Sequence, residues 1–247
     1  SGMKQVLVGL QPQNLEDVIA LISLYRPGPM DSIPTYLRNR HEPDKISYKT
    51  PQLAHILDVT NGCIVYQEQV MQIFRELAGT EPGHECPGCV ANGISEKVAN
   101  EIYDEMSSFA SYAFNKSHAA CYAYVAFQTA YLKCHYPSEF MAALLTSVLD
   151  NTDKVIEYSG ECARLGIKVL PPDVNVSGGG FTADENGQIR FGLNAVKNVG
   201  RNLIENVVRE RRNKPYTSLY DFCKRMHGNE LNRRAVECLI KAGAFDR

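Results

Sequence analysis

Four polar residues, Asn115, Lys116, Ser117 and His118, stand directly before a long apolar segment. That segment repeats its larger side chains every three and four residues, which is typical of a helix, and Pro137 stops it. The amide groups at a helix start favour negative charge, and Lys116 adds a full positive one. The spacing therefore predicts an anion site in a loop that opens onto a helix. The alternative is that Ser117 caps the helix and Lys116 is solvated.

His118 and one further residue, Arg26, could add chemistry to this candidate site. His118 is a plausible proton donor near a leaving group, although it would equally serve as a helix cap. Arg26 precedes Pro27-Gly28-Pro29, which ends a helix abruptly, and from that break it can point into a cleft. The residues alone leave the functional and the structural interpretation of both side chains open.

Four segments resemble one protein family. They are FNKSHAACYAYVAFQTAYLKCHYPSEFMAALLTSVLDNTDKV at residues 114–155, SLYRPGPM at 23–30, GCIVYQEQVMQI at 62–73 and LGIKVLPPDVN at 165–175. Together they resemble the C-family bacterial replicative DNA polymerases, the DNA polymerase III alpha subunits. The resemblance covers nearly the whole chain. It implies the end of the palm, the fingers and the start of a DNA-contacting region.

The resemblance also implies a reaction and partners. The parent enzyme adds deoxynucleoside monophosphates to a primer 3′ end on a DNA template, uses Mg²⁺, and works with a sliding clamp and other replisome subunits. Arg26 and residues 115–118 would shape the pocket for the deoxynucleoside triphosphate. Gln67, Glu68 and Gln69 stand at a predicted helix start, where they could reach a nucleotide or a template base or could only cap the helix and face water. The family keeps its catalytic carboxylates before the segment that starts at Ser1. We therefore expect no catalytic residue and no Mg²⁺ site here, and an inactive fragment.

Residues 79–89 depart from the family pattern. The family carries a longer, strongly basic helical insert at this place, whereas this chain has Thr80-Glu81-Pro82-Gly83-His84-Glu85-Cys86-Pro87-Gly88. The sequence leaves open whether this shortening is engineered or natural. His84, Cys86 and Cys89 suggest a zinc site, but a structural zinc needs four ligands and no matching pair follows. A bridging loop is the better interpretation, and zinc is not expected.

The C-terminal part predicts a contact with DNA. Residues 194–208 are typical of a short helix, a hairpin with Gly200 and a second helix. A second copy is predicted from Ser218 to Leu239, with its turn at residues 227–229. Hairpin amides and a helix start would meet a DNA phosphate without reading sequence. A purely structural hairpin pair is the alternative. The candidate DNA-binding residues are Lys197, Gly200, Arg201, Arg233 and Arg234.

The charge distribution agrees with this placement. Residues 190–247 hold 13 Lys and Arg against 6 Asp and Glu, although the whole chain of 247 residues has a net charge of −2. No apolar run approaches the roughly 20 residues that span a bilayer, so we expect a cytoplasmic protein without membrane partners. The eight cysteines are scattered and do not resemble a secreted disulfide framework.

The expected fold is mainly α: a multi-helix fingers domain with a small β element near residues 167–193, followed by a helix-hairpin-helix region. We place the domain boundary near residue 175, which gives domains of 1–175 and 176–247. Two alternatives from other classes are a non-enzymatic, sequence-independent DNA-binding scaffold and a zinc-stabilised interaction domain. No glycine-rich phosphate loop of the usual spacings occurs in the sequence.

Overall fold

The computed structural model describes residues 2–79, 85–110, 113–228 and 230–246. The chain divides into two compact units, residues 1–128 and 129–247, here called unit 1 and unit 2. The dividing point lies inside the longest helix, α7 (Lys116–His135). The two family-derived domains of 1–175 and 176–247 stay a prediction.

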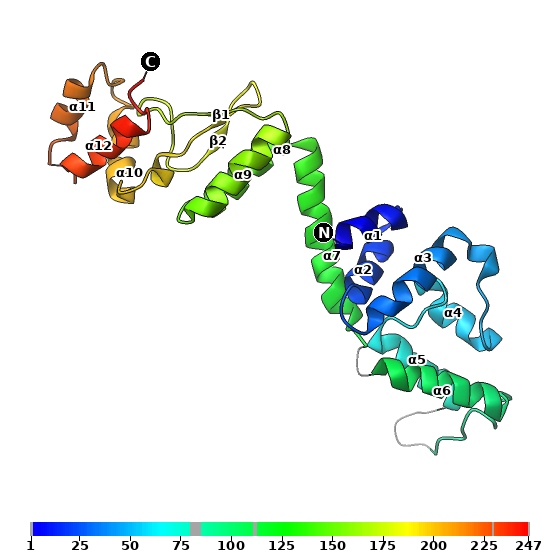
Figure 1. Cartoon of the computed structure of the whole chain (residues 1–247). Coiled ribbons are helices and arrows are strands. Elements are labelled where there is room, and N and C mark those ends of the chain that lie inside the picture. The colour runs from blue at the N-terminus through cyan, green and yellow to red at the C-terminus, as the bar shows by residue number, and fades with distance from the viewer. Residues whose placement is uncertain (1, 80–84, 111–112, 229, 247) are drawn as a thin grey trace. The chain divides into compact units, whose positions relative to one another are not determined.

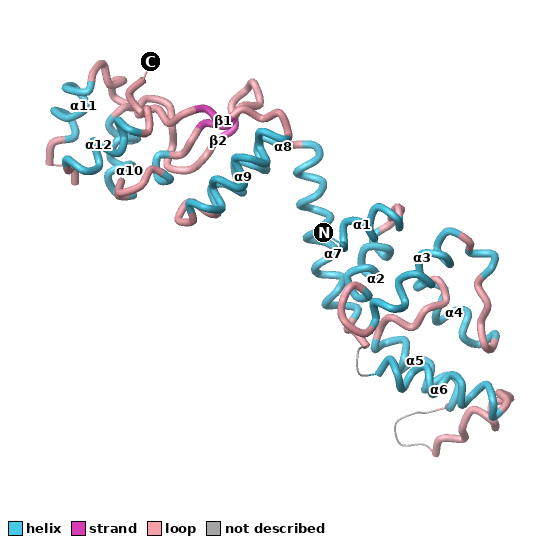
Figure 2. The backbone as a smooth tube through the Cα atoms, viewed as in Figure 1, coloured by secondary structure: helices cyan, strands magenta, loops and turns pink. Residues whose placement is uncertain are grey.

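Unit 1 consists of helices joined by loops (Figures 1 and 2). Its α-helices, besides the first part of α7, are α1 (Gly2–Leu10), α2 (Leu15–Leu24), α3 (Ile33–His41), α4 (Ala54–Leu57), α5 (Gln67–Ala78) and α6 (Glu96–Ala110). Short 3-10 turns are η1 (Pro29–Ser32), η2 (Pro43–Lys45), η3 (Pro51–Leu53) and η4 (Asp58–Thr60).

The sequence explains where α2 begins and why the chain turns after it. Asn14 adopts an extended conformation and accepts a hydrogen bond from the Asp17 amide, which is the expected N-cap geometry. After α2 ends at Leu24, Gly28 has a φ of 97°, in a region that favours glycine. The Asp17 carboxylate is buried and pairs with Arg40 of α3 at 2.9 Å. This pair ties α2 to α3.

Unit 1 has two apolar cores. One joins α2 and α3 to the start of α7, where the small side chains of Ala119 and Ala123 are fully buried. The other joins α4, α5 and α6 through residues such as Ile73 and Ile102. The helix α5 lies beside α6 (Figure 1). Alanines thus allow close packing on α7, as their small size predicts.

Unit 2 begins with helices and a small sheet. The helices are α8 (Pro137–Ser147) and α9 (Thr152–Arg164), and the strands are β1 (Val169–Leu170), β2 (Thr182–Ala183) and β3 (Ile189–Arg190). The strand order is β1-β3-β2. The strand β1 is parallel to β3, with Val169 opposite Ile189, and β2 is antiparallel to β3. The predicted β element near residues 167–193 is therefore confirmed, with β2 as an unpredicted third strand.

The remaining elements of unit 2 are η5 (Leu193–Ala195), α10 (Arg201–Glu210), α11 (Leu219–Met226) and α12 (Arg233–Lys241). They share a core that includes Leu203, Val207, Phe222 and Leu239. A second core joins α8 and α9 to the sheet. The mainly α fold expected from the sequence is confirmed.

Two arginines fasten the C-terminal end of α10. The Arg211 guanidinium donates to the backbone carbonyls of Val174, Val176 and Ser177 at 2.6 to 3.2 Å. Arg225 donates to the carbonyls of Glu210 and Lys214, each at 2.8 Å, and to that of Pro215 at 3.3 Å. Burial lowers the pKa of Arg211 from its ordinary value. These two basic side chains therefore have internal, structural roles.

Ser138 does not cap α8, although Ser is among the residue types preferred at an N-cap. The helix begins one residue earlier, at Pro137, whose fixed φ suits the first helical position, and Tyr136 occupies the N-cap position. The Ser138 hydroxyl instead donates to the Gly187 carbonyl at 2.6 Å. No helix in the described part of the chain is both long enough and apolar enough to cross a membrane.

Candidate functional site

Two of the sequence motifs meet at the start of α7 in unit 1. Tyr66, at the start of α5, forms an isolated parallel β-bridge with Phe114. The amide of Gln67 donates to the Phe114 carbonyl at 3.0 Å. These contacts hold the first turn of α5 next to the first turn of α7, although the two segments are nearly 50 residues apart in sequence.

Asn115 is the cap of α7. Its side-chain oxygen accepts the His118 amide at 2.9 Å, and the helix begins at Lys116. The expectation that Lys116, Ser117 and His118 lie in a loop is therefore wrong, because all three are in the first helical turn. Ser117 is exposed and does not occupy the capping position. Asn and Ser are equally good N-cap residues, so residue preference alone could not show whether Asn115 or Ser117 caps α7.

The start of α7 already binds a carboxylate. Both side-chain oxygens of Glu68 accept the Lys116 amide, at 3.1 and 3.2 Å, and the Asn115 side-chain amide donates to Glu68 at 3.1 Å. The Lys116 ammonium pairs with Glu16 at 3.0 Å. The alternative that Lys116 is merely solvated is therefore wrong. This helix start holds two carboxylates of the chain itself.

Arg26 lies beside the same loop. Its Nε donates to the Ser23 carbonyl at 2.7 Å, and its guanidinium carbon is 4.1 Å from the centre of the Phe114 ring. Such a position over an aromatic face is favourable for a cation. Burial lowers the pKa of Arg26 from its ordinary value, but an arginine remains charged at neutral pH. The structure thus brings Arg26 next to Phe114, the residue that directly precedes residues 115–118.

The ring of His118 packs edge-on against two aromatic rings. The ring centres are 5.4 Å from Phe114 and 4.9 Å from Tyr122. Because Asn115 provides the cap, His118 is not needed for that purpose. Its exposed ring remains accessible to a ligand.

The three polar residues that begin α5 differ in their surroundings. Gln69 is buried and accepts the amides of Val65 and Tyr66 at 2.9 and 3.0 Å, so it is a structural residue. Gln67 donates to the Ala113 carbonyl at 3.1 Å. Glu68 alone reaches the start of α7. No sequence signal named Glu68 as its partner, because a contact over 48 residues leaves no periodic pattern.

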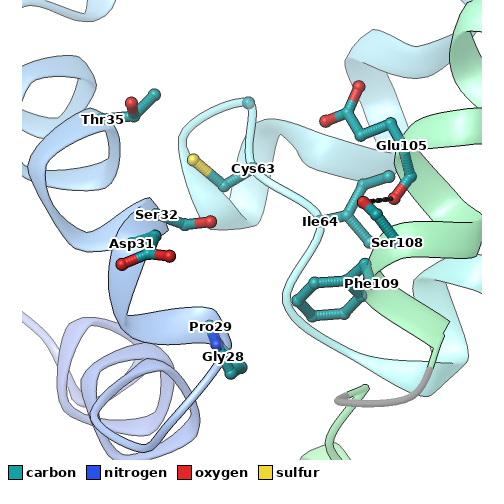
Figure 3. A pocket seen from close by; sticks show the side chains of 11 residues that line it. Gly28, Pro29, Asp31, Ser32, Thr35, Cys63, Ile64, Glu105, Ser108 and Phe109 are labelled. Atoms are coloured by element: carbon teal, nitrogen blue, oxygen red, sulfur yellow. Dashed lines mark hydrogen bonds between the residues drawn. The ribbon is translucent and has the colours of Figure 1, made fainter.

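Beside the RPGP turn, unit 1 contains a cavity of about 610 Å³ that the sequence did not predict (Figure 3). Asp31, Ser32 and Thr35 lie on one side, and Glu105 and Ser108 of α6 lie on the other, as Figure 3 shows. None of the lining residues is basic. Burial raises the pKa of the Cys63 thiol at its wall to about 11. Two carboxylates and a neutral thiol do not suit a phosphate.

In unit 2, the first predicted hairpin runs from η5 to α10. Its first helix is a single 3-10 turn, and Asn198 in the connecting loop has a φ of 61°. Gly200 holds the N-cap position of α10 with no side-chain cap. Its φ is −73°, which any residue adopts, and a Cβ there would meet no atom within 4 Å. Nothing within the described chain therefore requires glycine at this position.

The second predicted hairpin is formed by α11 and α12. Both helices have side-chain caps: Ser218 accepts from the Asp221 amide at 3.1 Å, and Asn232 accepts from the Ala235 amide at 2.9 Å. Residue 229 of the connecting turn lies outside the described residues. The two hairpins share one core.

The candidate DNA-binding side chains are exposed. Arg201 pairs with Asp150 at 2.7 Å, and Arg233 pairs with Glu237 within α12 at 2.8 Å. For Lys197 and Arg234 the described part of the chain shows no ion pair. All four lie at or just before the starts of α10 and α12.

The described residues offer no site that fits a metal ion. Across residues 2–79, 85–110, 113–228 and 230–246, no group of three or more His, Cys, Asp or Glu side chains is arranged to hold one. Of the three residues in the zinc hypothesis, His84 lies outside the described residues. The Cys86 thiol donates to the Ala78 carbonyl at 3.0 Å.

Comparison with known proteins gives two family matches. The family model of the bacterial DNA polymerase III alpha subunit finger domain matches residues 1–121. A model of a helix-hairpin-helix motif matches residues 166–247. The first match contains Arg26 and the start of α7, and the second contains both hairpins.

Curated relatives cover the whole chain. The DNA polymerase III subunit alpha of Xylella fastidiosa is 45% identical over 269 residues, which include 100% of this chain and 22% of the relative. That of Thermus aquaticus is 45% identical over 273 residues, with 99% and 22% covered. That of Escherichia coli K12 is 42% identical over 277 residues, with 100% and 24% covered. The chain spans less than a quarter of the length of these relatives.

Proposed function

The chain belongs to the family of bacterial DNA polymerase III alpha subunits, and from this premise we propose that it supplies two surfaces of a replicative DNA polymerase. Unit 1 faces the incoming deoxynucleoside triphosphate, and unit 2 grips duplex DNA. The reaction of the whole polymerase is the DNA-templated addition of deoxynucleotides to a primer 3′ end. Catalysis needs segments of the relatives that this chain does not match, so this chain alone is inactive.

We assign binding of the deoxynucleoside triphosphate to the start of α7. Arg26, Asn115, Lys116, Ser117 and His118 would face the phosphates, with His118 as a proton donor near the pyrophosphate leaving group. Two observations support this assignment. Arg26 and His118 both contact the Phe114 ring, and the amide of Lys116 holds the Glu68 carboxylate, as expected of a helix start that stabilises an anion.

The assignment of DNA binding to unit 2 rests on one observation: no side chain caps the start of α10. Gly200 leaves the first amides of this helix without a side-chain cap, and the exposed cations Lys197 and Arg201 stand beside it. A glycine that its own surroundings do not require is explained by the close approach of a ligand backbone. Arg233 and Arg234 at α12 would add two phosphate contacts. Such contacts are indifferent to base sequence.

Other properties of the whole polymerase are proposed from the family. Mg²⁺ would be held by carboxylates outside this chain, and no step of the chemistry is assigned here through the ion. Primer-template DNA, the sliding clamp and other replisome subunits are the proposed partners, in the bacterial cytoplasm. A DNA-binding scaffold without catalysis is the second candidate, and the basic hairpin pair favours it for this chain alone.

The test is the affinity of this chain for a primed DNA duplex, measured by fluorescence anisotropy at several salt concentrations. Binding should weaken steeply with salt, because each phosphate contact releases counterions. Changing Lys197, Arg201, Arg233 and Arg234 to Ala should reduce the slope by about 0.9 for each phosphate that the variant no longer neutralises.

A matched control removes four exposed cations of unit 1: Lys4, Lys45, Arg75 and Lys97. It carries the same change in net charge and should keep the slope. Equal slopes for both variants would show that net charge, and not the hairpin pair, causes binding. Absence of binding at low salt would contradict the DNA assignment.

A further inference from the structure

The anion site at the start of α7 is electrically balanced by carboxylates of the chain itself. Its two cations are Arg26 and Lys116, and its two anions are Glu16 and Glu68. Both the ammonium and the amide of Lys116 lie close to a carboxylate of the chain. The ammonium contacts Glu16 at 3.0 Å, and the amide contacts both oxygens of Glu68.

A buried tyrosine adds a second, independent observation. Tyr66 is 1% exposed, and its hydroxyl has no hydrogen-bond partner among the described residues. Its ring lies 5.3 Å from the Lys116 ammonium. Burial raises the pKa of Tyr66, and the nearby Glu16 and Glu68 charges raise it further, so the phenol stays protonated. A buried phenol with an unsatisfied hydroxyl thus lies close to the Lys116 ammonium.

We propose that Glu16 and Glu68 determine which anions this site accepts, selecting a polyphosphate over a single phosphate. The proposal rests on the proposed nucleotide-facing function of the same site. Glu68 is half-buried and tethered, so it competes with a free anion as an internal ligand. Orthophosphate would displace only one carboxylate, so its binding would gain little free energy.

A polyphosphate gains more because it is longer and more highly charged. Its phosphates can contact the α7 amides, the Lys116 ammonium and the Arg26 guanidinium at the same time. Several charge-assisted contacts together compensate for the displaced carboxylates. The pair of glutamates therefore sets a threshold of ligand charge, and a triphosphate exceeds it.

The experiment measures binding of orthophosphate and of tripolyphosphate by isothermal titration calorimetry to the 247-residue chain. Wild type should bind tripolyphosphate and show weak or no binding of orthophosphate. E68Q keeps the hydrogen-bond acceptor but removes the charge, and it should bind tripolyphosphate about fivefold more tightly, the scale of one partly exposed ion pair. E16Q/E68Q should acquire measurable orthophosphate binding.

E96Q is the control, because Glu96 is exposed in the first turn of α6 and its substitution removes the same charge from unit 1. It should leave both affinities unchanged. Circular dichroism melting of each variant checks that the fold is retained. K116A should abolish tripolyphosphate binding if the ligand occupies this site.

The outcomes separate the two proposals. Tripolyphosphate binding that depends on Lys116 but is the same in wild type, E68Q and E16Q/E68Q would overturn the selectivity proposal and leave the proposed function intact. No tripolyphosphate binding by any variant would overturn both. A gain for E96Q equal to that for E68Q would show a general charge effect and would also overturn the selectivity proposal.

Discussion

At the start of α7 the first helical amide holds the Glu68 carboxylate, whereas at the start of α10 Gly200 leaves the amides without a side-chain cap. In other respects the two helix N-termini are alike. Each has a basic residue at the first helical position, and each of these pairs with a carboxylate: Lys116 with Glu16 at 3.0 Å, and Arg201 with Asp150 at 2.7 Å.

The comparison shows that a basic helix start can bind an anion through two separate groups, the basic side chain and the backbone amides. At α7 both are occupied by the chain itself. At α10 only the side chain is occupied, by a pair that is exposed on both partners, with 65% of the Arg201 side chain and 85% of Asp150 accessible. Exposed pairs are weak, so the start of α10 is less occupied by the chain's own carboxylates than the start of α7.

The largest expected effect comes from Gly192, which precedes η5 and so supports the α10 hairpin. A Cβ at this position would lie 2.5 Å from the carbonyl carbon of Gly180, and backbone atoms cannot yield as a flexible side chain does. Gly192→Ala should lower the free energy of unfolding by about 2–3 kcal/mol, the usual cost of overpacking. Urea denaturation followed by circular dichroism measures it.

Gly200→Ala is the matched control for that substitution, because a Cβ at Gly200 meets open space. Its unfolding free energy should fall by less than about 1 kcal/mol, because Ala is a poorer N-cap than Gly. A comparable loss of stability in both variants would contradict the view that Gly192 serves internal packing and Gly200 serves a ligand.

Gly200→Asp should make the start of α10 resemble that of α7. An Asp at the N-cap stabilises a helix by a few tenths of a kcal/mol relative to Gly. The same carboxylate would occupy the amides and repel a phosphate, so DNA affinity should fall about tenfold, which corresponds to ~1.4 kcal/mol. Thermal melting and anisotropy with the primed duplex would show the two opposite effects.

Gly200→Asn separates the charge from the cap. It should stabilise α10 by a similar amount and weaken DNA binding less than the Asp variant. If the Asp variant bound DNA as wild type does, the bare amides of α10 would have no part in DNA binding.

The smallest effect is expected from Asp150→Asn. This change releases Arg201 from its exposed partner, and DNA binding should become about twofold tighter, within the range of a surface ion pair. The gain should disappear in the Arg201→Ala background, because the two residues act as a pair. A gain that persists there would mean that Asp150 repels DNA directly.

Much of the fold could be predicted from local chemistry. The Asn14 cap, the stop at the RPGP turn and the spacing of the second hairpin all depend on neighbouring residues, and the structure contains each of them. The small sheet was expected, but β2 was not, because two residues of strand leave almost no pattern. The resemblance of long motifs identified the family.

Local sequence could not show which residue caps α7 or which carboxylates pair with its basic residue. Ser117 and Asn115 are both good caps, and only the structure shows that Asn115 has the role. Glu68 reaches Lys116 across 48 residues, and Glu16 reaches it across a full 100, so neither pair follows from helical spacing. Positions of charged residues in sequence thus indicate candidate cations, but not which anions neutralise them.

The arginines at the far end of α10 have a consequence for motion. Arg211, directly after this helix, donates to three backbone carbonyls of residues 174–177, and Arg225 donates to the carbonyl of Glu210, the last residue of the helix. The N-terminal end of the helix has no side-chain cap. Local opening should therefore begin at the N-terminus and stop before the last turn. In hydrogen exchange, amide protection should rise along α10 from Arg201 towards Glu210. The N-terminal end of α10, which would contact a DNA phosphate, is also the end that opens first. DNA binding there should therefore slow hydrogen exchange at the amides that exchange fastest.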